Sequence, residues 1–112
     1  MAFAIDLTGR AALVTGSGQG VGYAIAQHLA AAGATVFVND LRAERATEAA
    51  SSIVAAGGDA RPLAFDVTDH DAVAAAYAST GGVDILVNNA GNAGGDGFGR
   101  LDPFARTTPA SW

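Results

Sequence analysis

The feature that most constrains the fold is a regular alternation of two apolar patterns. Short and nearly continuous apolar runs, typical of buried strands, occupy residues 11–14, 35–38, 62–65 and 84–87. Between them lie longer segments with apolar residues at helical spacing, each closed by glycine. Strands that alternate with helices pair in parallel through right-handed crossovers. We therefore predict an α/β fold with a doubly wound parallel sheet.

Each of the three helical segments is predicted to bury one face. In the first, this face consists of Val21, Ala24, Ile25, His28, Leu29 and Ala32. In the second, it consists of Ala46, Ala49, Ala50, Ile53 and Val54. The third should begin with a capping box of Thr68 and Asp71 and bury Val73, Ala76 and Tyr77. A further helix is expected to start at Thr108 and Pro109.

Composition and charge exclude several classes of function. The 112 residues contain no cysteine and no lysine, and six arginines against eleven acidic residues give a net charge of −5. The absence of cysteine excludes disulfides and thiolate metal sites, and favours a reducing, cytoplasmic setting. The net charge argues against a nucleic-acid partner. No apolar segment is long enough to span a membrane, and no His, Asp and Glu set has metal-site spacing.

A glycine-rich stretch joins the first predicted strand to the first helix. Residues 15–22 read TGSGQGVG, and four glycines exceed what a plain turn requires, which suggests that a ligand approaches the backbone. The missing lysine excludes a P-loop, and Val21 and Tyr23 stand where the G-x-G-x-x-G pattern requires glycine. The pattern that fits is T-G-x-x-x-G-x-G, formed by Thr15, Gly16, Gly20 and Gly22.

Three more stretches follow in order along the chain. Asp40 closes the second strand, Asp66 and Val67 follow the third, and residues 88–91 (NNAG) close the fourth. Together with the glycine turn, these stretches resemble the short-chain dehydrogenase/reductase family over the whole chain. The resemblance implies a Rossmann-like sheet of strand order 3-2-1-4. It also implies that residues 1–112 are the N-terminal part of a single dinucleotide-binding domain that looks truncated.

The resemblance also implies a set of cofactor-binding residues, with NAD as the expected cofactor. The set is Gly16, Ser17, Gly18, Gln19, Gly20, Val21, Asp40, Leu41, Asp66, Val67, Asn89, Ala90 and Gly91. The glycine turn would hold the pyrophosphate at a helix N-terminus. Gly18 is an extra glycine that the motif does not require. Asn89, Ala90 and Gly91 would line the ribose on the nicotinamide side.

The expected preference for NAD depends on Asp40. This carboxylate would accept hydrogen bonds from the adenosine ribose and repel a 2′-phosphate. NADP-dependent members tend to have a basic residue where this chain has Gln19 or Leu41, although Arg42 follows directly. Asp66 and Val67 would contact the adenine ring.

Each of these residues also has a simpler interpretation. The glycines could form only a tight strand–helix turn, and Asp40 could be a solvated loop acid. Asp66 could help to start the third helix, a role compatible with binding adenine. His28 and His70 are interpreted as ordinary helix residues.

The catalytic residues of the family are missing from this chain. The family uses a tyrosine followed four residues later by a lysine, but Gln27 follows Tyr23 at this spacing and Gly81 follows Tyr77. We therefore expect no catalytic residue here. We interpret the chain as the NAD-binding part of a longer homo-oligomeric enzyme, a dimer or tetramer, that transfers hydride between nicotinamide and an alcohol or ketone. The alternative is a non-catalytic nucleotide-binding or assembly module completed by a partner chain.

Overall fold

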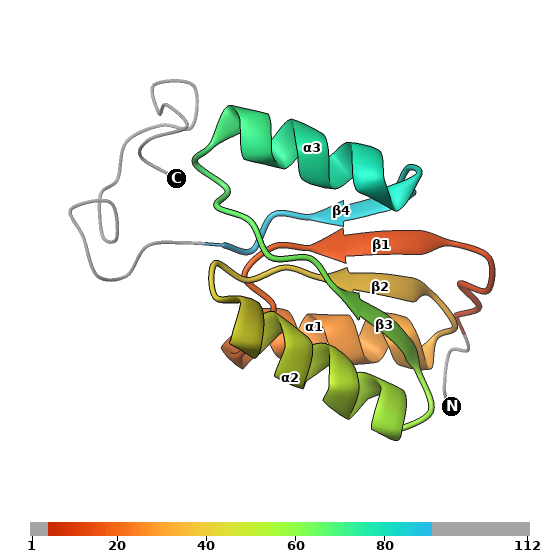
Figure 1. The fold of residues 1–112 in the computed structure, drawn as a ribbon. Helices are drawn as coiled ribbons and strands as arrows, with labels where there is room; N and C mark the ends of the chain where they lie inside the picture. Colours follow the sequence, from red (N-terminus) through yellow and green to blue (C-terminus); the bar gives the residue numbers. More distant parts are fainter. Residues whose placement is uncertain (1–4, 91–112) are drawn as a thin grey trace, which may run out of the picture.

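The predicted alternation of strands and helices folds into a parallel sheet with helices on both faces (Figure 1). The computed structural model describes residues 5–90. The elements in chain order are β1 (Ala11–Val14), α1 (Gly20–Ala31), β2 (Thr35–Val38), α2 (Ala43–Ala55), β3 (Asp59–Pro62), α3 (His70–Thr80) and β4 (Ile85–Val87). The strand order is β3-β2-β1-β4, and each neighbouring pair is parallel. The predicted strand order and doubly wound arrangement are confirmed.

The main core lies between the sheet and the helices α1 and α2, which share one face of the sheet (Figure 1). Successive strand residues point to opposite faces, so every second residue of β1 and β2 meets these helices. The buried residues of this layer are Ala12, Val14, Val36, Val38 and Ala60 from the strands, Ala34 just before β2, and Ala26, Ala30, Ala49, Ala50 and Ile53 from the helices. The many alanines allow close approach of helix to sheet, which fixes the carboxyl ends of β1 and β2.

The opposite face, on which α3 lies, is covered less completely by the described residues. The pairing of β1 with β4 and β2 places Leu86, Leu13 and Phe37 in one row. Leu13 and Phe37 are buried, whereas Leu86 is 56% exposed. Every residue of α3 is exposed or half-buried, so the predicted buried face of this helix is wrong within residues 5–90. The physical reason is that α3 borders a three-residue edge strand that offers it little apolar surface.

Two other helical details differ from the prediction. The buried residues of α1 are Gly22, Ala26 and Ala30, so that Val21, Ala24 and His28 remain exposed. The N-cap of α3 is Asp69, whose carboxylate accepts a hydrogen bond from the Ala72 N–H at 3.1 Å. The capping box of Thr68 and Asp71 is therefore wrong, because the Thr68 hydroxyl donates to Asp66 instead.

The third strand begins earlier than predicted. It spans Asp59–Pro62 rather than residues 62–65, because its partners in the parallel pairing are the four residues of β2. Pro62 is its last residue, opposite Val38. The position of β3 in the sequence is therefore determined by its pairing with β2 and not by the local run of apolar residues.

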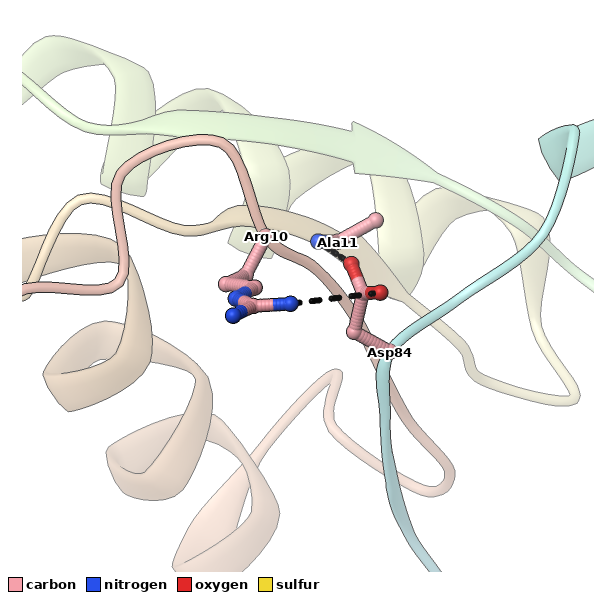
Figure 2. A network of polar contacts seen from close by, with 3 residues as sticks. All are labelled: Arg10, Ala11 and Asp84. Atoms are coloured by element: carbon pink, nitrogen blue, oxygen red, sulfur yellow. Dashed lines mark hydrogen bonds and ion pairs between the residues drawn. The ribbon is translucent and has the colours of Figure 1, made fainter.

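The amino ends of β1 and β4 are joined by Asp84, as Figure 2 shows. Its carboxylate accepts a hydrogen bond from the Ala11 N–H at 2.9 Å, and its own N–H donates to the Ala11 carbonyl at 2.8 Å. Arg10 lies 3.9 Å from the same carboxylate, but both side chains are exposed and such pairs contribute little stability. The two hydrogen bonds fix how β4 is aligned on β1, and so where the turn after β4 lies.

Among residues 5–90, none of the helices is both long and apolar enough to cross a bilayer. The predicted site residue Gly91 and the predicted helix start at Thr108 and Pro109 lie outside the described residues.

Candidate functional site

A cleft of about 630 Å³ opens at the carboxyl ends of the strands. Nine predicted site residues line it: Gly16, Gln19, Gly20, Asp40, Leu41, Asp66, Val67, Asn89 and Ala90. Asn39, Arg45, Phe65 and Thr68 line it as well. Ligands of open α/β sheets bind at this end, beside the point where the strand order reverses. In this sheet the reversal occurs between β1 and β4.

Two turns are locked together across this reversal point. The Thr15 hydroxyl oxygen accepts hydrogen bonds from the backbone N–H groups of Asn89 and Ala90, both at 3.0 Å. The Asn89 side-chain amide donates in return to the Gly16 carbonyl at 3.2 Å. The turn after β1 and the turn after β4 are therefore one connected unit. Both turns were predicted to lie at the cleft, and the structure shows that they also contact each other directly.

Close packing explains two of the motif glycines. Gly16 has a φ of +62°, and a Cβ there would lie 2.9 Å from the Ala90 Cα. A Cβ on Gly22 would lie 2.5 Å from the Asn89 side-chain nitrogen, and close to the Gly16 carbonyl. Either side chain would push the two turns apart, so both positions require glycine.

Asn39 is a central residue of the cleft that the sequence analysis did not identify. Its side-chain oxygen accepts a hydrogen bond from the Gly16 N–H at 3.1 Å. Its side-chain nitrogen donates to the carbonyls of Leu63 and Phe65, at 3.0 and 3.1 Å. The side chain is buried and connects the turns after β1, β2 and β3. The signal available in the sequence was an amide, able both to donate and to accept, placed directly after a buried strand.

Three predicted residues of the glycine turn lie outside the cleft lining. Ser17 is buried, and its hydroxyl donates to the Val14 carbonyl at 2.7 Å. Its backbone N–H donates to the Asn39 carbonyl at 2.7 Å, so both donors of Ser17 already have partners at the ends of β1 and β2. Val21 is 71% exposed in the first turn of α1. Gly18 is half-buried beside Asp40.

Asp40 is the acidic residue at the β2 end of the cleft. The residue is only 7% exposed, and one carboxylate oxygen accepts a hydrogen bond from the Arg42 N–H at 3.0 Å. Among the described residues no cation lies within ion-pair distance of this carboxylate. Leu41, the next predicted residue, is 69% exposed. Asp40 therefore places a carboxyl group in the cleft wall.

Asp66 shapes the turn between β3 and α3 and also lines the cleft. The Thr68 hydroxyl donates to its carboxylate at 2.7 Å, and the Thr68 N–H donates to the same oxygen at 2.9 Å. The side-chain bond from Thr68, and then the backbone bond, lower the pKa of Asp66 below its ordinary value. The backbone carbonyl of Asp66 accepts a hydrogen bond from the Asp69 N–H at 3.0 Å. Asp66 therefore helps to start helix α3, as its simpler interpretation expected.

The first turn of α1 faces the cleft without an acidic residue in it. Gln19 is its N-cap residue, and in the described structure its side chain makes no capping hydrogen bond. The first N–H groups of a helix have no partner within the helix and carry its positive dipole end. His28 and His70 are exposed on their helices, and residues 5–90 contain no group of three or more acidic or histidine residues able to hold a metal. Within residues 5–90 the site thus combines a helix N-terminus that has no acidic residue in its first turn with one buried acid, Asp40.

Comparison with known proteins places these features in a family. The model of the family described as short chain dehydrogenase matches residues 10–112. Gluconate 5-dehydrogenase of Gluconobacter oxydans is 46% identical over 90 residues, which are 77% of this chain and 35% of that protein. The 7alpha-hydroxysteroid dehydrogenase of Escherichia coli is 41% identical over 94 residues, 80% of this chain and 37% of that protein. The chain thus spans about a third of the length of these relatives.

Solved structures agree with the sequence relatives. The crystal structure of a hydroxysteroid dehydrogenase from Escherichia coli is similar with a TM-score of 0.73 and 40% identity, covering 80% of this chain and 39% of that chain. A metagenomic short-chain oxidoreductase in complex with NADP has a TM-score of 0.72 and 39% identity, covering 95% of this chain and 48% of that chain. These findings favour the oxidoreductase interpretation over a non-catalytic module. The chain belongs to the short-chain dehydrogenase family, whose members are oxidoreductases that use a nicotinamide cofactor.

Proposed function

We propose that this chain is the NAD-binding part of a short-chain dehydrogenase/reductase that transfers hydride between nicotinamide and an alcohol or ketone. The observation that carries this proposal is the locked pair of turns after β1 and β4, with Asp40 in the wall of the same cleft. Residues 1–112 would form the N-terminal part of one dinucleotide-binding domain. The whole protein is proposed to be a cytoplasmic dimer or tetramer.

The residues of the cleft fit the chemistry of a dinucleotide. Its pyrophosphate needs several N–H donors and close access to the backbone, which the glycine turn and the N-terminus of α1 provide. Gly16, Gln19 and Gly20 line the cleft at this point. A cleft of about 630 Å³ also lies within the size range of cofactor sites.

The remaining parts of the dinucleotide would contact the other turns. Asp66 and Val67 line the cleft beyond β3, where they would meet adenine. Asn89 and Ala90 line it beyond β4, where they would meet the ribose next to nicotinamide, and Gly91 would extend this contact. Bound nicotinamide would supply the carbon that accepts or donates hydride. The task of this chain's residues would be to bind and orient the cofactor, and the tyrosine–lysine pair would come from the rest of the protein.

The preference for NAD over NADP is proposed from charge. The Asp40 carboxylate would accept hydrogen bonds from ribose hydroxyls, and burial strengthens its repulsion of a 2′-phosphate. Leu41 and Gln19, which also line the cleft, add no positive charge beside it. Arg45 lines the cleft as well, so the preference reflects a balance of charges.

The test is a titration of the whole protein that contains this chain with NADH and NADPH, followed by calorimetry or cofactor fluorescence. We expect NADH to bind at least tenfold more tightly than NADPH, since a lost charge-assisted hydrogen bond alone is worth about that factor. Asp40→Asn keeps the shape but removes the charge, and should bring the two dissociation constants within about threefold. Binding of neither dinucleotide would refute the proposed function, whereas tighter binding of NADPH would refute only the preference for NAD.

A further inference from the structure

The fourth glycine of the turn, Gly18, is not explained by the motif or by its backbone conformation. The motif needs glycine at 16, 20 and 22 only. Gly16 and Gly20 have positive φ angles, but Gly18 does not, so other residues could adopt its backbone conformation. The reason for glycine at this position must therefore be space.

The space above Gly18 is taken by Asp40 and by the first turn of α2. A Cβ at this position would lie 2.8 Å from the Asp40 Cγ, and closer still to one carboxylate oxygen. It would also lie 2.9 Å from the Cβ of Arg45. Real Cβ atoms essentially never approach other atoms this closely, so a side chain would force a shift.

The Asp40 side chain is the part able to shift. The Cβ of Arg45 is tied to the backbone of α2, next to Ala46, which is fully buried. The Asp40 carboxylate, in contrast, can rotate if it gives up its hydrogen bond from the Arg42 N–H at 3.0 Å. A methyl group at position 18 would therefore first displace the carboxylate that reaches into the cleft.

We propose that Gly18 is a specificity-determining residue that acts through Asp40. Because position 18 has no side chain, the Asp40 carboxylate lies against the glycine turn, where it would accept hydrogen bonds from the ribose of the cofactor. The inference rests on the proposed function, because it concerns how the same cleft distinguishes NAD from NADP. It predicts that the identity of residue 18 changes cofactor selectivity although Gly18 does not line the cleft.

The experiment compares Gly18→Ala with a matched variant, Gly58→Ala. Gly58 also lacks a positive φ, and a Cβ there would lie 2.9 Å from Ile53 in the core, far from the cleft lining. Dissociation constants for NADH and NADPH are measured directly, together with the midpoint of thermal unfolding. Both variants should lower the unfolding midpoint, but only Gly18→Ala should change the ratio of the two dissociation constants.

We expect Gly18→Ala to weaken NADH binding about tenfold and to leave NADPH binding within about twofold, as loss of a charged hydrogen-bond partner implies. In an Asp40→Ala background, adding Gly18→Ala should change NADH binding less than about twofold, because coupled residues are non-additive. An unchanged ratio in Gly18→Ala, or additive effects in the double variant, would overturn the inference.

Two further outcomes are also decisive. If Gly18→Ala does not fold, Gly18→Ala/Asp40→Ala should restore folding; failure to do so would assign the requirement to Arg45 and overturn the inference. If the unmodified whole protein binds neither dinucleotide, the proposed function fails. A chain that prefers NADH but whose Gly18→Ala variant keeps that preference contradicts only the role of Gly18.

Discussion

Removal of the Asn39 side chain should be the most damaging single change in the cleft. Its amide makes three hydrogen bonds, to the Gly16 N–H and to the carbonyls of Leu63 and Phe65, at 3.0 to 3.1 Å. A net value of about 1 kcal/mol for each bond gives a loss of about 3 kcal/mol for Asn39→Ala. Because small domains are stable by only about 5–15 kcal/mol, this is a large part of the total.

Asn39→Leu distinguishes hydrogen bonding from volume. Leucine fills a similar space but keeps water away, so the three backbone groups would be buried without partners. Each unpaired group costs about 1–3 kcal/mol, and we therefore expect Asn39→Leu to be at least as destabilising as Asn39→Ala. If Asn39 were important only as a volume filler, leucine would instead preserve stability.

The assay is urea unfolding with linear extrapolation of the free energy of unfolding. Gln27→Ala is the control, since it truncates an exposed amide on α1 and should change stability by no more than about 0.5 kcal/mol. The expected order of stability is wild type and Gln27→Ala, then Asn39→Ala, then Asn39→Leu. An Asn39→Leu variant as stable as the wild type would refute the argument that this amide holds three turns together.

Three other predictions concern two turns around the cleft and the amino ends of β1 and β4. Thr15→Val removes the hydroxyl oxygen that accepts hydrogen bonds from the N–H groups of Asn89 and Ala90. It should lower the free energy of unfolding by about 2 kcal/mol and weaken NADH binding. Undiminished stability would show that these bonds do not hold the turns after β1 and β4 together. Thr68→Val should raise the pKa of Asp66 towards an ordinary value of about 3.9, as followed by carboxyl NMR shifts, while the pKa of Asp6, lowered by its own threonine, stays unchanged. Because the folded pKa of Asp66 is lowered, its contribution to stability is present above the unfolded pKa and lost as pH falls through the folded value. Thr68→Val should reduce this acid dependence but not abolish it, since the backbone N–H of residue 68 still donates to Asp66. Asp84→Ala should destabilise the chain by about 1–2 kcal/mol, because the Ala11 N–H loses its acceptor. Salt screens the Arg10–Asp84 ion pair, so the same loss of stability at high salt would show that the hydrogen bond to Ala11 is responsible.

Most element positions could be predicted from the sequence because they follow from local apolar periodicity, whereas the strand order was predicted from the resemblance to the short-chain dehydrogenase/reductase family. The carboxyl ends of parallel strands meet at one edge, so the motifs after β1, β2, β3 and β4 could be placed around one cleft. Strand β3 was misplaced because its position depends on pairing with β2, which a local pattern does not contain. The face of α3 was misjudged for a similar reason, since burial depends on what covers the helix.

The roles of Asn39 and Gly18 depend on contacts between distant parts of the chain. Asn39 connects to residues 23, 24 and 26 positions away, and nothing in its immediate surroundings specifies these partners. Position 18 requires glycine because Asp40, just after β2, and Arg45, on α2, occupy the space above it. A motif indicates which residue types recur, but the physical reason for one of them can lie in a different element.

The pairing of β1 with β4 has a consequence for the order of folding. The hydrogen bonds that hold β4 join residues 72 to 75 positions apart, whereas β1 and β2 are connected through a single helix. Closing a long loop costs more chain entropy and is slower than closing a short one. We therefore expect the β1–α1–β2 unit to assemble first and β4 to join late. The cleft acquires its second wall only at that step, so during synthesis the chain should gain affinity for a dinucleotide only after the turn at Asn89 has left the ribosome.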